Sequence, residues 1–261
     1  MHKPLCDVLV MSEKRKNMLL HLQDGKQEME FLLKSLKTTR QALLPQIKIL
    51  EENHLVNHYE DIYELTTIGK LVVDNIVPLL NTLEVFETDI DYWGTHDISF
   101  IPPKLFNEIY KIRKLEVVNP SITDIYRLNE KVWKTSSISK SHRGVITFFH
   151  PSFHILLSDL ISNNVETYLI MPPDVIDTFK SENSGQLEKF MESGIFHLFV
   201  YNQDLKVTGI ACNDYYFFMR QFKTNGEFDV KYVLSDDKDA LEWGKELFEY
   251  YLEDSIPITD I

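Results

Sequence analysis

Apolar residues recur at helical spacing through the first fifty positions of the chain and predict three helices. The first covers residues 12–24 and stops at a glycine, the residue best suited to a left-handed helix end. The second covers residues 28–36, where apolar side chains stand at i, i+3, i+4 and i+7. The third covers residues 39–50 and follows two threonines, either of which can cap it. A short turn is therefore expected between the second and third helices.

The third predicted helix has two chemically different faces. At about 100° per residue, Leu43, Ile47 and Leu50 share one side. The opposite side carries Thr38, Gln41, Pro45 and Lys48. A helix enters the major groove of double-stranded DNA only if its outward face is uncharged or basic and can bond base edges. The three helices alone fit a helix that reads DNA and a plain three-helix packing unit with solvated polar faces equally well.

Individual residues of this segment suit particular contacts with DNA. Gln41 can pair with adenine, Arg40 with guanine or phosphate, and Lys48 with phosphate. Pro45 lacks a backbone donor and is expected to bend the helix. The full set of expected DNA contacts is Thr38, Thr39, Arg40, Gln41, Pro45, Gln46, Lys48, His58 and Tyr59.

Residues 55–65 predict a strand, a turn and a second strand. Together with the helix pair and the closing stretch Tyr63-Glu64-Leu65-Thr66-Thr67-Ile68-Gly69, this hairpin resembles the winged helix-turn-helix transcription regulators of archaea and bacteria. The tip departs from their pattern, because it holds Glu60-Asp61 rather than lysine or arginine. Contact between the tip and phosphate therefore depends on His58 or Tyr59.

A connecting helix is predicted next, and its apolar residues repeat at spacings of three and four. They are Ile68, Leu71, Val72, Ile76, Leu79, Leu80, Leu83 and Phe86. Packing against its own domain and pairing with a second copy fit so short a stripe equally well. Function favours a homodimer, because two reading helices bind two half-sites about one helical turn apart.

The rest of the chain alternates predicted strands and helices and then forms a meander of strands. Strands are expected at 115–118, 144–149, 165–171, 195–201, 207–212 and 215–222, and helices at 124–133, 153–161, 175–179, 186–191 and after Asp236 or Asp237. Asn213-Asp214 is expected to form a two-residue hairpin turn. The fold class is α+β: a DNA-binding domain with its connecting helix at residues 1–88, and an α/β mixed-sheet sensor domain at residues 89–261.

Several short motifs resemble the methanogenesis regulatory protein family of archaea. They are Ile68-Gly69-Lys70, Pro78-Leu79-Leu80-Asn81-Thr82-Leu83-Glu84, Asp91-Tyr92-Trp93 with His96-Asp97, Ile101-Pro102, Phe149-His150-Pro151 and Ala240-Leu241-Glu242-Trp243-Gly244. The resemblance covers nearly the whole chain. It implies DNA binding controlled by a metabolite or redox signal, and a sensor half similar in outline to single phospholipase D-like units. It does not name the ligand.

Charge is divided unevenly between the two predicted domains. The chain has 261 residues, 27 basic and 40 acidic side chains, and a formal net charge of −13. Residues 1–81 hold 10 basic and 11 acidic side chains, whereas residues 82–261 hold 17 and 29. Only the first part can approach a polyanion without repulsion. Two distant cysteines, no secretion signal and no apolar run of roughly 20 residues favour a cytoplasmic protein without a membrane partner.

Patterns typical of catalysis or of a bound cofactor are absent from the sequence. Phospholipase D chemistry needs His-x-Lys, and none of the nine histidines has lysine two positions later. There is no glycine-rich nucleotide-binding loop. His150 and His154 are four residues apart but have no third metal ligand at a suggestive spacing. We therefore expect no enzymatic activity, no cofactor and no metal.

A small-molecule effector is nevertheless expected in the second domain. The strand at 144–149 runs into a helix that starts at Ser152, where backbone amides can hold an anion. The expected ligand contacts are Arg143, His150, Ser152 and Arg220. For the arginines among them, simple pairing with surface carboxylates is the favoured alternative, because charged groups are often structural. For the whole chain, the alternative function is a metabolic enzyme or a protein-binding adaptor that uses its helical domain for contacts.

Overall fold

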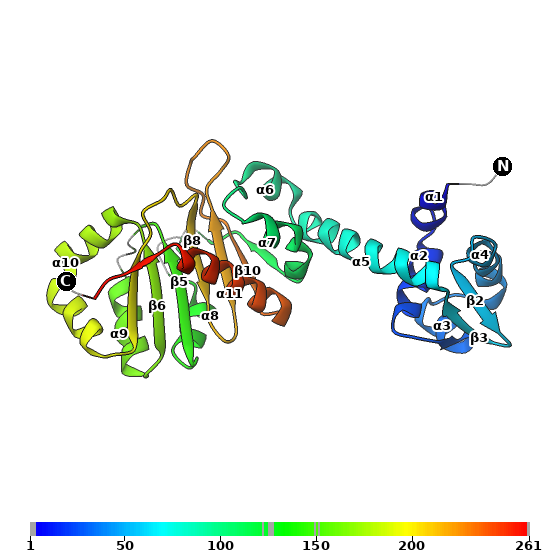
Figure 1. Ribbon diagram of the computed structural model, residues 1–261, viewed down its shortest axis with the longest axis horizontal. Helices are drawn as coiled ribbons and strands as arrows, with labels where there is room; N and C mark the ends of the chain where they lie inside the picture. Colours follow the sequence, from blue (N-terminus) through cyan, green and yellow to red (C-terminus); the bar gives the residue numbers. More distant parts are fainter. Residues whose placement is uncertain (1–3, 122, 125–127, 149, 151, 260–261) are drawn as a thin grey trace. The chain divides into compact units, whose positions relative to one another are not determined.

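The computed structural model describes residues 4–121, 123–124, 128–148, 150 and 152–259, apart from the side chains of 182–184. The chain forms two compact units, Met1–Leu80 and Asn81–Ile261 (Figure 1). Their boundary lies inside helix α5 (Thr67–Glu87), rather than behind it at residue 88. The reason is that Val73 is buried in the core of the first unit, whereas Val85 is buried in the core of the second.

The first unit contains the predicted helices and hairpin. Its elements are α1 (Leu5–Val10), α2 (Glu13–Gln23), β1 (Gln27–Glu28), α3 (Met29–Ser35), α4 (Arg40–Glu52), β2 (Val56–Tyr59), β3 (Ile62–Leu65) and the start of α5. The three strands form an antiparallel sheet in the order β1-β3-β2. Strand β1 was not predicted, because two polar residues carry no strand pattern of their own and owe their pairing to β3.

Side-chain caps fix where α4 and α5 begin. The hydroxyl of Thr39 accepts a hydrogen bond from the amide of Ala42, and that of Thr66 accepts one from the amide of Gly69. Gly69 also permits a close approach of two segments, since an added Cβ would lie 2.0 Å from the carbonyl oxygen of Leu55. The N-terminal end of α5 is thereby held against the segment that enters β2.

The second unit is built on one eight-stranded mixed sheet. Its strands are β4 (Glu116–Val118), β5 (Ser141–Ile146), β6 (Glu166–Met171), β7 (Phe196–Val200), β8 (Val207–Cys212), β9 (Phe217–Gln221), β10 (Tyr232–Ser235) and β11 (Ile256–Pro257). Their order is β11-β7-β6-β5-β8-β9-β10-β4. Strands β5, β6 and β7 are parallel, and all other neighbours are antiparallel. This confirms the predicted mixed sheet, while the likeness to phospholipase D-like units stays a prediction.

Helices cover both faces of this sheet. They are α6 (Ile90–Thr95), α7 (Pro103–Asn107), the 3-10 helix η1 (Ile109–Ile112), α8 (Glu130–Ser136), α9 (Phe153–Ser162), α10 (Pro173–Glu192) and α11 (Lys238–Glu253). Val145 joins the cluster of α7 and α11 on one face, and Ile146 joins the cluster of α9 and α10 on the other, as strand alternation requires. A small third cluster joins Val132 of α8 to Tyr232 and Leu234 of β10.

Two local predictions for the second unit are wrong. The helical stretches 175–179 and 186–191 belong to the single helix α10. The hairpin between β8 and β9 has four connecting residues, 213–216, because Cys212 pairs with Phe217. The side-chain oxygen of Asn213 accepts hydrogen bonds from the amides of Tyr215 and Tyr216 and stabilises this longer turn. Residues 125–127 and 149, which fall within a predicted helix and strand, lie outside the described residues.

Candidate functional site

The outward face of α4 presents polar side chains, as the sequence predicted. Leu43, Ile47 and Leu50 are buried in the core of the first unit. Gln41, Pro45 and Lys48 are exposed on the other side of the helix. Leu44 is exposed as well, at 43%, which adds an apolar contact beside the polar ones. Helix α4 continues through Pro45 from Arg40 to Glu52.

Neighbouring carboxylates contact three of the candidate residues. The guanidinium of Arg40 faces Asp61 at the hairpin tip, with Nη2 2.5 Å from Oδ1 and Nη1 3.2 Å from Oδ2. Lys48 Nζ lies 3.9 Å from Glu52 Oε1, and the ring of His58 contacts the carboxylate of Glu51. The hydrogen bond from Arg40 lowers the pKa of the Asp61 carboxyl below its usual value. Without a ligand, the cations at this face are therefore matched by acidic neighbours.

Gln46 is turned toward α2. Its Oε1 atom accepts hydrogen bonds from Arg15 Nη1 at 2.7 Å and from Ser12 Oγ at 3.2 Å. Arg15 Nε also donates to the carbonyl of Val8 at 2.5 Å. Gln46 thus fastens α4 to the segment between α1 and α2, which was not expected for a DNA contact. Only a long-range contact shows this role, and sequence spacing cannot reveal it.

The hairpin contributes one strongly exposed aromatic side chain. Tyr59 ends β2 and is 77% exposed. His58, which precedes it, stacks on Tyr63 with ring centroids 5.5 Å apart. At the start of α4, Thr39 is exposed and Thr38 is half-buried. The structure therefore brings α4 and the end of β2 together on the first unit, with Gln46 on the flank.

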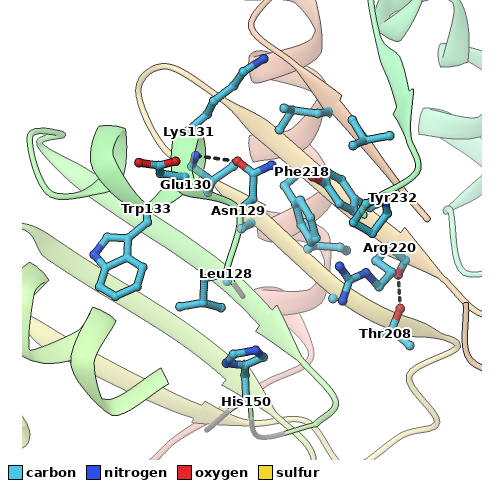
Figure 2. A pocket seen from close by; sticks show the side chains of 18 of the residues that line it. Leu128, Asn129, Glu130, Lys131, Trp133, His150, Thr208, Phe218, Arg220 and Tyr232 are labelled. Atoms are coloured by element: carbon cyan, nitrogen blue, oxygen red, sulfur yellow. Dashed lines mark hydrogen bonds between the residues drawn. The ribbon is translucent and has the colours of Figure 1, made fainter. Parts of the chain in front are cut away.

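A separate cavity lies on one face of the sheet in the second unit. Within the described residues it has a volume of about 500 Å³ and lies between the α8 cluster and the α9 cluster. Strands β5, β8, β9 and β10 form its floor. Figure 2 shows Arg220, Phe218 and Tyr232 on one side of the space and Trp133 and His150 across from them. Both its size and its mainly apolar walls are typical of small-molecule sites.

Arg220 carries the positive charge inside this cavity. Its guanidinium carbon lies 5.3 Å from the ring centre of Tyr232, 5.5 Å from that of Phe218 and 5.7 Å from that of Phe228. Its Nε atom is shut off from solvent and has no hydrogen-bond partner in the described part of the chain. Burial lowers the pKa of Arg220, although an arginine stays protonated in proteins. The described residues thus give it aromatic faces but no carboxylate within ion-pair distance.

The floor of the cavity contributes a neutral histidine, and the rest of the lining contributes carboxylates. His142 is fully enclosed in the floor, its Nδ1 atom is 3.0 Å from Ser136 Oγ, and burial lowers its pKa to about 4. It is therefore neutral at physiological pH. The lining also includes the carboxylates of Glu116, Asp124 and Glu130. Lys131 belongs to the lining too, and its Nζ atom lies 3.4 Å from Glu116 Oε1.

Two of the four predicted ligand residues line the cavity. Arg220 and His150 do so. Arg143 does not, because successive residues of a strand point to opposite faces, and His142 and Gly144 occupy the cavity face of β5. Arg143 lies near Glu249 of α11 instead, with Nε 3.5 Å from Oε1. Ser152 is outside the lining as well, and its amide donates to His150 Nδ1 at 3.1 Å, so that amide is already used.

Aromatic residues of the cavity were missed at the level of sequence. Phe218 and Arg220 stand two apart on β9, which is the alternation of side chains that share one face. That signal was available, but Tyr232 and Trp133 come from β10 and α8, which only the fold brings to the same place. For metals, no group of three or more His, Cys, Asp or Glu side chains among the described residues is arranged to hold an ion. In the same part of the chain, no helix has both the length and the apolar character needed to cross a bilayer.

Comparison with known proteins gives matches in both units. Residues 5–84 match the N-terminal domain of the methanogenesis regulatory protein FilR1, and residues 125–254 match its middle domain. The methanogenesis regulatory protein FilR1 of Methanothrix harundinacea (strain 6Ac) is 23% identical over 253 residues. This alignment covers 95% of the chain and 56% of the relative, so the chain spans about half the length of that curated protein.

Solved structures give weaker similarities. The archaeal chromatin protein TrmBL2 is 11% identical, with coverage of 95% of this chain and 94% of its own and a TM-score of 0.43. The quinone-bound YodB from B. subtilis is 20% identical, with coverage of 30% and 89% and a TM-score of 0.28. TM-scores at this level do not establish a shared fold.

The family matches agree with the division of the chain. The N-terminal match covers the helices and hairpin of the first unit together with most of α5. The middle-domain match covers the cavity-bearing sheet of the second unit except its edge strands β4 and β11. The two matches follow one another in the order that the sequence motifs predicted. The chain belongs to the methanogenesis regulatory protein FilR1 family.

Proposed function

We propose that this protein is a sequence-specific DNA-binding transcriptional regulator, that it acts as a homodimer, and that its second unit responds to a small molecule. The observation that carries the proposal is the outward face of α4, where Gln41, Pro45 and Lys48 are exposed opposite a buried apolar face. The name of the curated relative, a methanogenesis regulatory protein, supports a regulatory role.

Residue chemistry supports a division of labour along α4. Gln41 has the donor and acceptor needed for a two-point contact with adenine in the major groove. Arg40 and Lys48 are cations at the edges of the same face and suit phosphate oxygens. Their present partners are exposed carboxylates, and exposed ion pairs contribute little stability, so phosphate groups can replace those partners.

Helix α5 supports the proposed homodimer. Ile68, Leu71, Leu79 and Leu83 are 52%, 66%, 57% and 47% exposed, although all four are large and apolar. These four residues are called the α5 stripe below. Burial of the α5 stripe against a second copy would remove apolar surface from water, and a two-fold dimer would place two α4 helices on two half-sites of DNA.

Gel-shift titration of the full chain with its own promoter region tests the proposal. The wild type is expected to bind specifically, and Gln41→Ala together with Lys48→Glu is expected to weaken binding by at least about tenfold. Gln203→Ala together with Lys189→Glu, at exposed positions of the second unit, makes the same chemical changes and should leave affinity unchanged. Equal affinity for the wild type and the α4 double variant would remove α4 as the reading helix.

A further inference from the structure

We infer that the cavity of the second unit binds a molecule made of a compact apolar body and one carboxylate, with the carboxylate held by Arg220. This inference rests on the proposed ligand response and gives it a chemical class. It starts from the position of Arg220, which reaches into the cavity between aromatic rings (Figure 2).

The enclosed positive charge of Arg220 favours binding of an anionic ligand. A guanidinium loses hydrogen bonds to water when it is enclosed. The described residues surround that of Arg220 with aromatic faces and leave its Nε atom without a hydrogen-bond acceptor. Asp229 is the carboxylate whose charge acts on Arg220, but its Oδ2 lies 3.2 Å from His96 Nε2 and 3.9 Å from Lys223 Nζ. A planar carboxylate matches the fork of guanidinium donors and would supply the acceptor that the described residues do not place at Nε.

The surroundings favour a single negative charge over several. His142 is neutral in the cavity floor, because its burial lowers its pKa to about 4. Lys131, the other cation of the lining, has a partner in Glu116 at 3.4 Å. The Glu130 carboxylate of the lining has a partner in Lys134, whose Nζ atom lies 2.5 Å from Oε1. Among the described residues of the lining, Arg220 is thus the cation without a carboxylate at ion-pair distance, and a monocarboxylate balances its single charge.

Size and wall chemistry describe the remainder of the ligand. The volume of about 500 Å³ suits a small organic molecule rather than an inorganic anion. Leu128, Ile146, Phe153 and Leu156 line the part of the cavity beside α9, and they offer no charged partner. The body of the ligand is therefore an aromatic ring or a short aliphatic chain.

Trp133 provides a direct signal for binding, because it lines the cavity while Trp93 and Trp243 are buried in the core of the opposite face. We would titrate the full chain with phenylacetate and octanoate and follow tryptophan fluorescence and heat. Phenylacetamide and octanamide are the uncharged matches, and inorganic phosphate is the alternative anion. At least one carboxylate is expected to bind at least tenfold more tightly than its amide, and phosphate is expected not to bind.

Variants separate the role of Arg220 from general damage. Arg220→Met should lower carboxylate affinity at least tenfold and leave amide affinity unchanged, while Arg220→Lys should retain part of the preference. Arg143→Met is the matched control, because it removes an arginine on the opposite face of the same sheet. Thermal unfolding of each variant establishes that it is folded.

Three results would overturn the inference: no carboxylate binds at millimolar concentration, amides and carboxylates bind equally, or phosphate competes as well as the carboxylates. DNA binding by the same preparation without ligand is measured in parallel. Loss of carboxylate binding with intact DNA binding contradicts only this inference. Absence of DNA binding with intact carboxylate binding contradicts the proposed function instead.

Discussion

At the scale of single residues, Asp61 determines how much positive charge the outward face of α4 offers. It holds the guanidinium of Arg40 through two hydrogen bonds from the hairpin tip. In the proposed complex, a phosphate must take the place of this carboxylate. In that complex, the hairpin tip would compete with DNA for the same cation.

Replacement of Asp61 by asparagine is therefore expected to strengthen DNA binding. The change removes a negative charge and frees Arg40, so affinity at low salt should rise by roughly two- to tenfold, with a salt dependence steeper by about one ion. Gel shifts at several salt concentrations measure both effects, and Asp204→Asn in the second unit is the control. An unchanged or weaker affinity would show that Arg40 does not contact phosphate.

His142 links the stability of the protein to pH. Its pKa falls from 6.5 to about 4 on folding, because the imidazole is buried. As the pH falls below 6.5, His142 becomes protonated in the unfolded chain but stays neutral in the folded chain. Stability that is present above 6.5 is thus lost progressively toward pH 4, by about 2 kcal/mol at about pH 5.

Urea unfolding at about pH 7 and about pH 5 measures this loss. His142→Gln cannot titrate, so its stability should fall less on acidification, by about 2 kcal/mol. Asn202→Ala, an exposed replacement in the same unit that removes no titratable group, should retain the wild-type pH dependence. The assignment to His142 fails if both variants lose stability to the same extent as the wild type.

At the scale of elements, Gly69 shows how one backbone contact sets the entry to α5. Gly69→Ala should destabilise the protein by at least about 2 kcal/mol, because the new Cβ would lie 2.0 Å from the carbonyl oxygen of Leu55. Gly94→Ala is the matched control in helix α6, where nothing lies within 4 Å of an added Cβ. It should be neutral or stabilise by up to about 1 kcal/mol. Denaturant unfolding of both variants measures the difference, and equal stabilities would contradict the contact.

Elements were predicted well where the spacing of apolar residues along a segment reflects which of its side chains are buried. Helix α4 was predicted because the burial of Leu43, Ile47 and Leu50 repeats with the helical period. Strand β10 was missed, because its four residues are all buried and show no alternation. Helix α10 was predicted as two separate helices, because a polar stretch lies between their apolar residues. In the structure, Phe179 and Leu187 are both fully buried and belong to one continuous helix.

For the candidate sites too, the sequence indicated single residues but not the neighbours that the fold brings to them. Arg220 was singled out because it is a scarce basic group, but its aromatic neighbour Tyr232 comes from a strand that pairs with β9 only in the folded sheet. Arg143 was grouped with Arg220, yet the two side chains belong to opposite faces. Which residues share a site built from several strands depends on how those strands pair. The sequence of one segment does not determine that pairing.

At the scale of the whole molecule, the α5 stripe is the expected seam between two copies. Leu79→Lys places a charge within the stripe and should raise the dimer dissociation constant by at least about tenfold. Glu84→Lys, at an exposed position of the same helix, should leave it unchanged. Sedimentation velocity distinguishes the two forms. A wild-type protein that sediments as a monomer at all concentrations would contradict the dimer.

The most direct test of the central claim is an affinity profile across the operator, measured base pair by base pair for the wild type and for Gln41→Ala. If α4 reads the major groove, the variant should lose discrimination at one adenine in each half-site, worth about 1–3 kcal/mol, and keep the profile elsewhere. A variant profile identical to that of the wild type at every position would contradict the account.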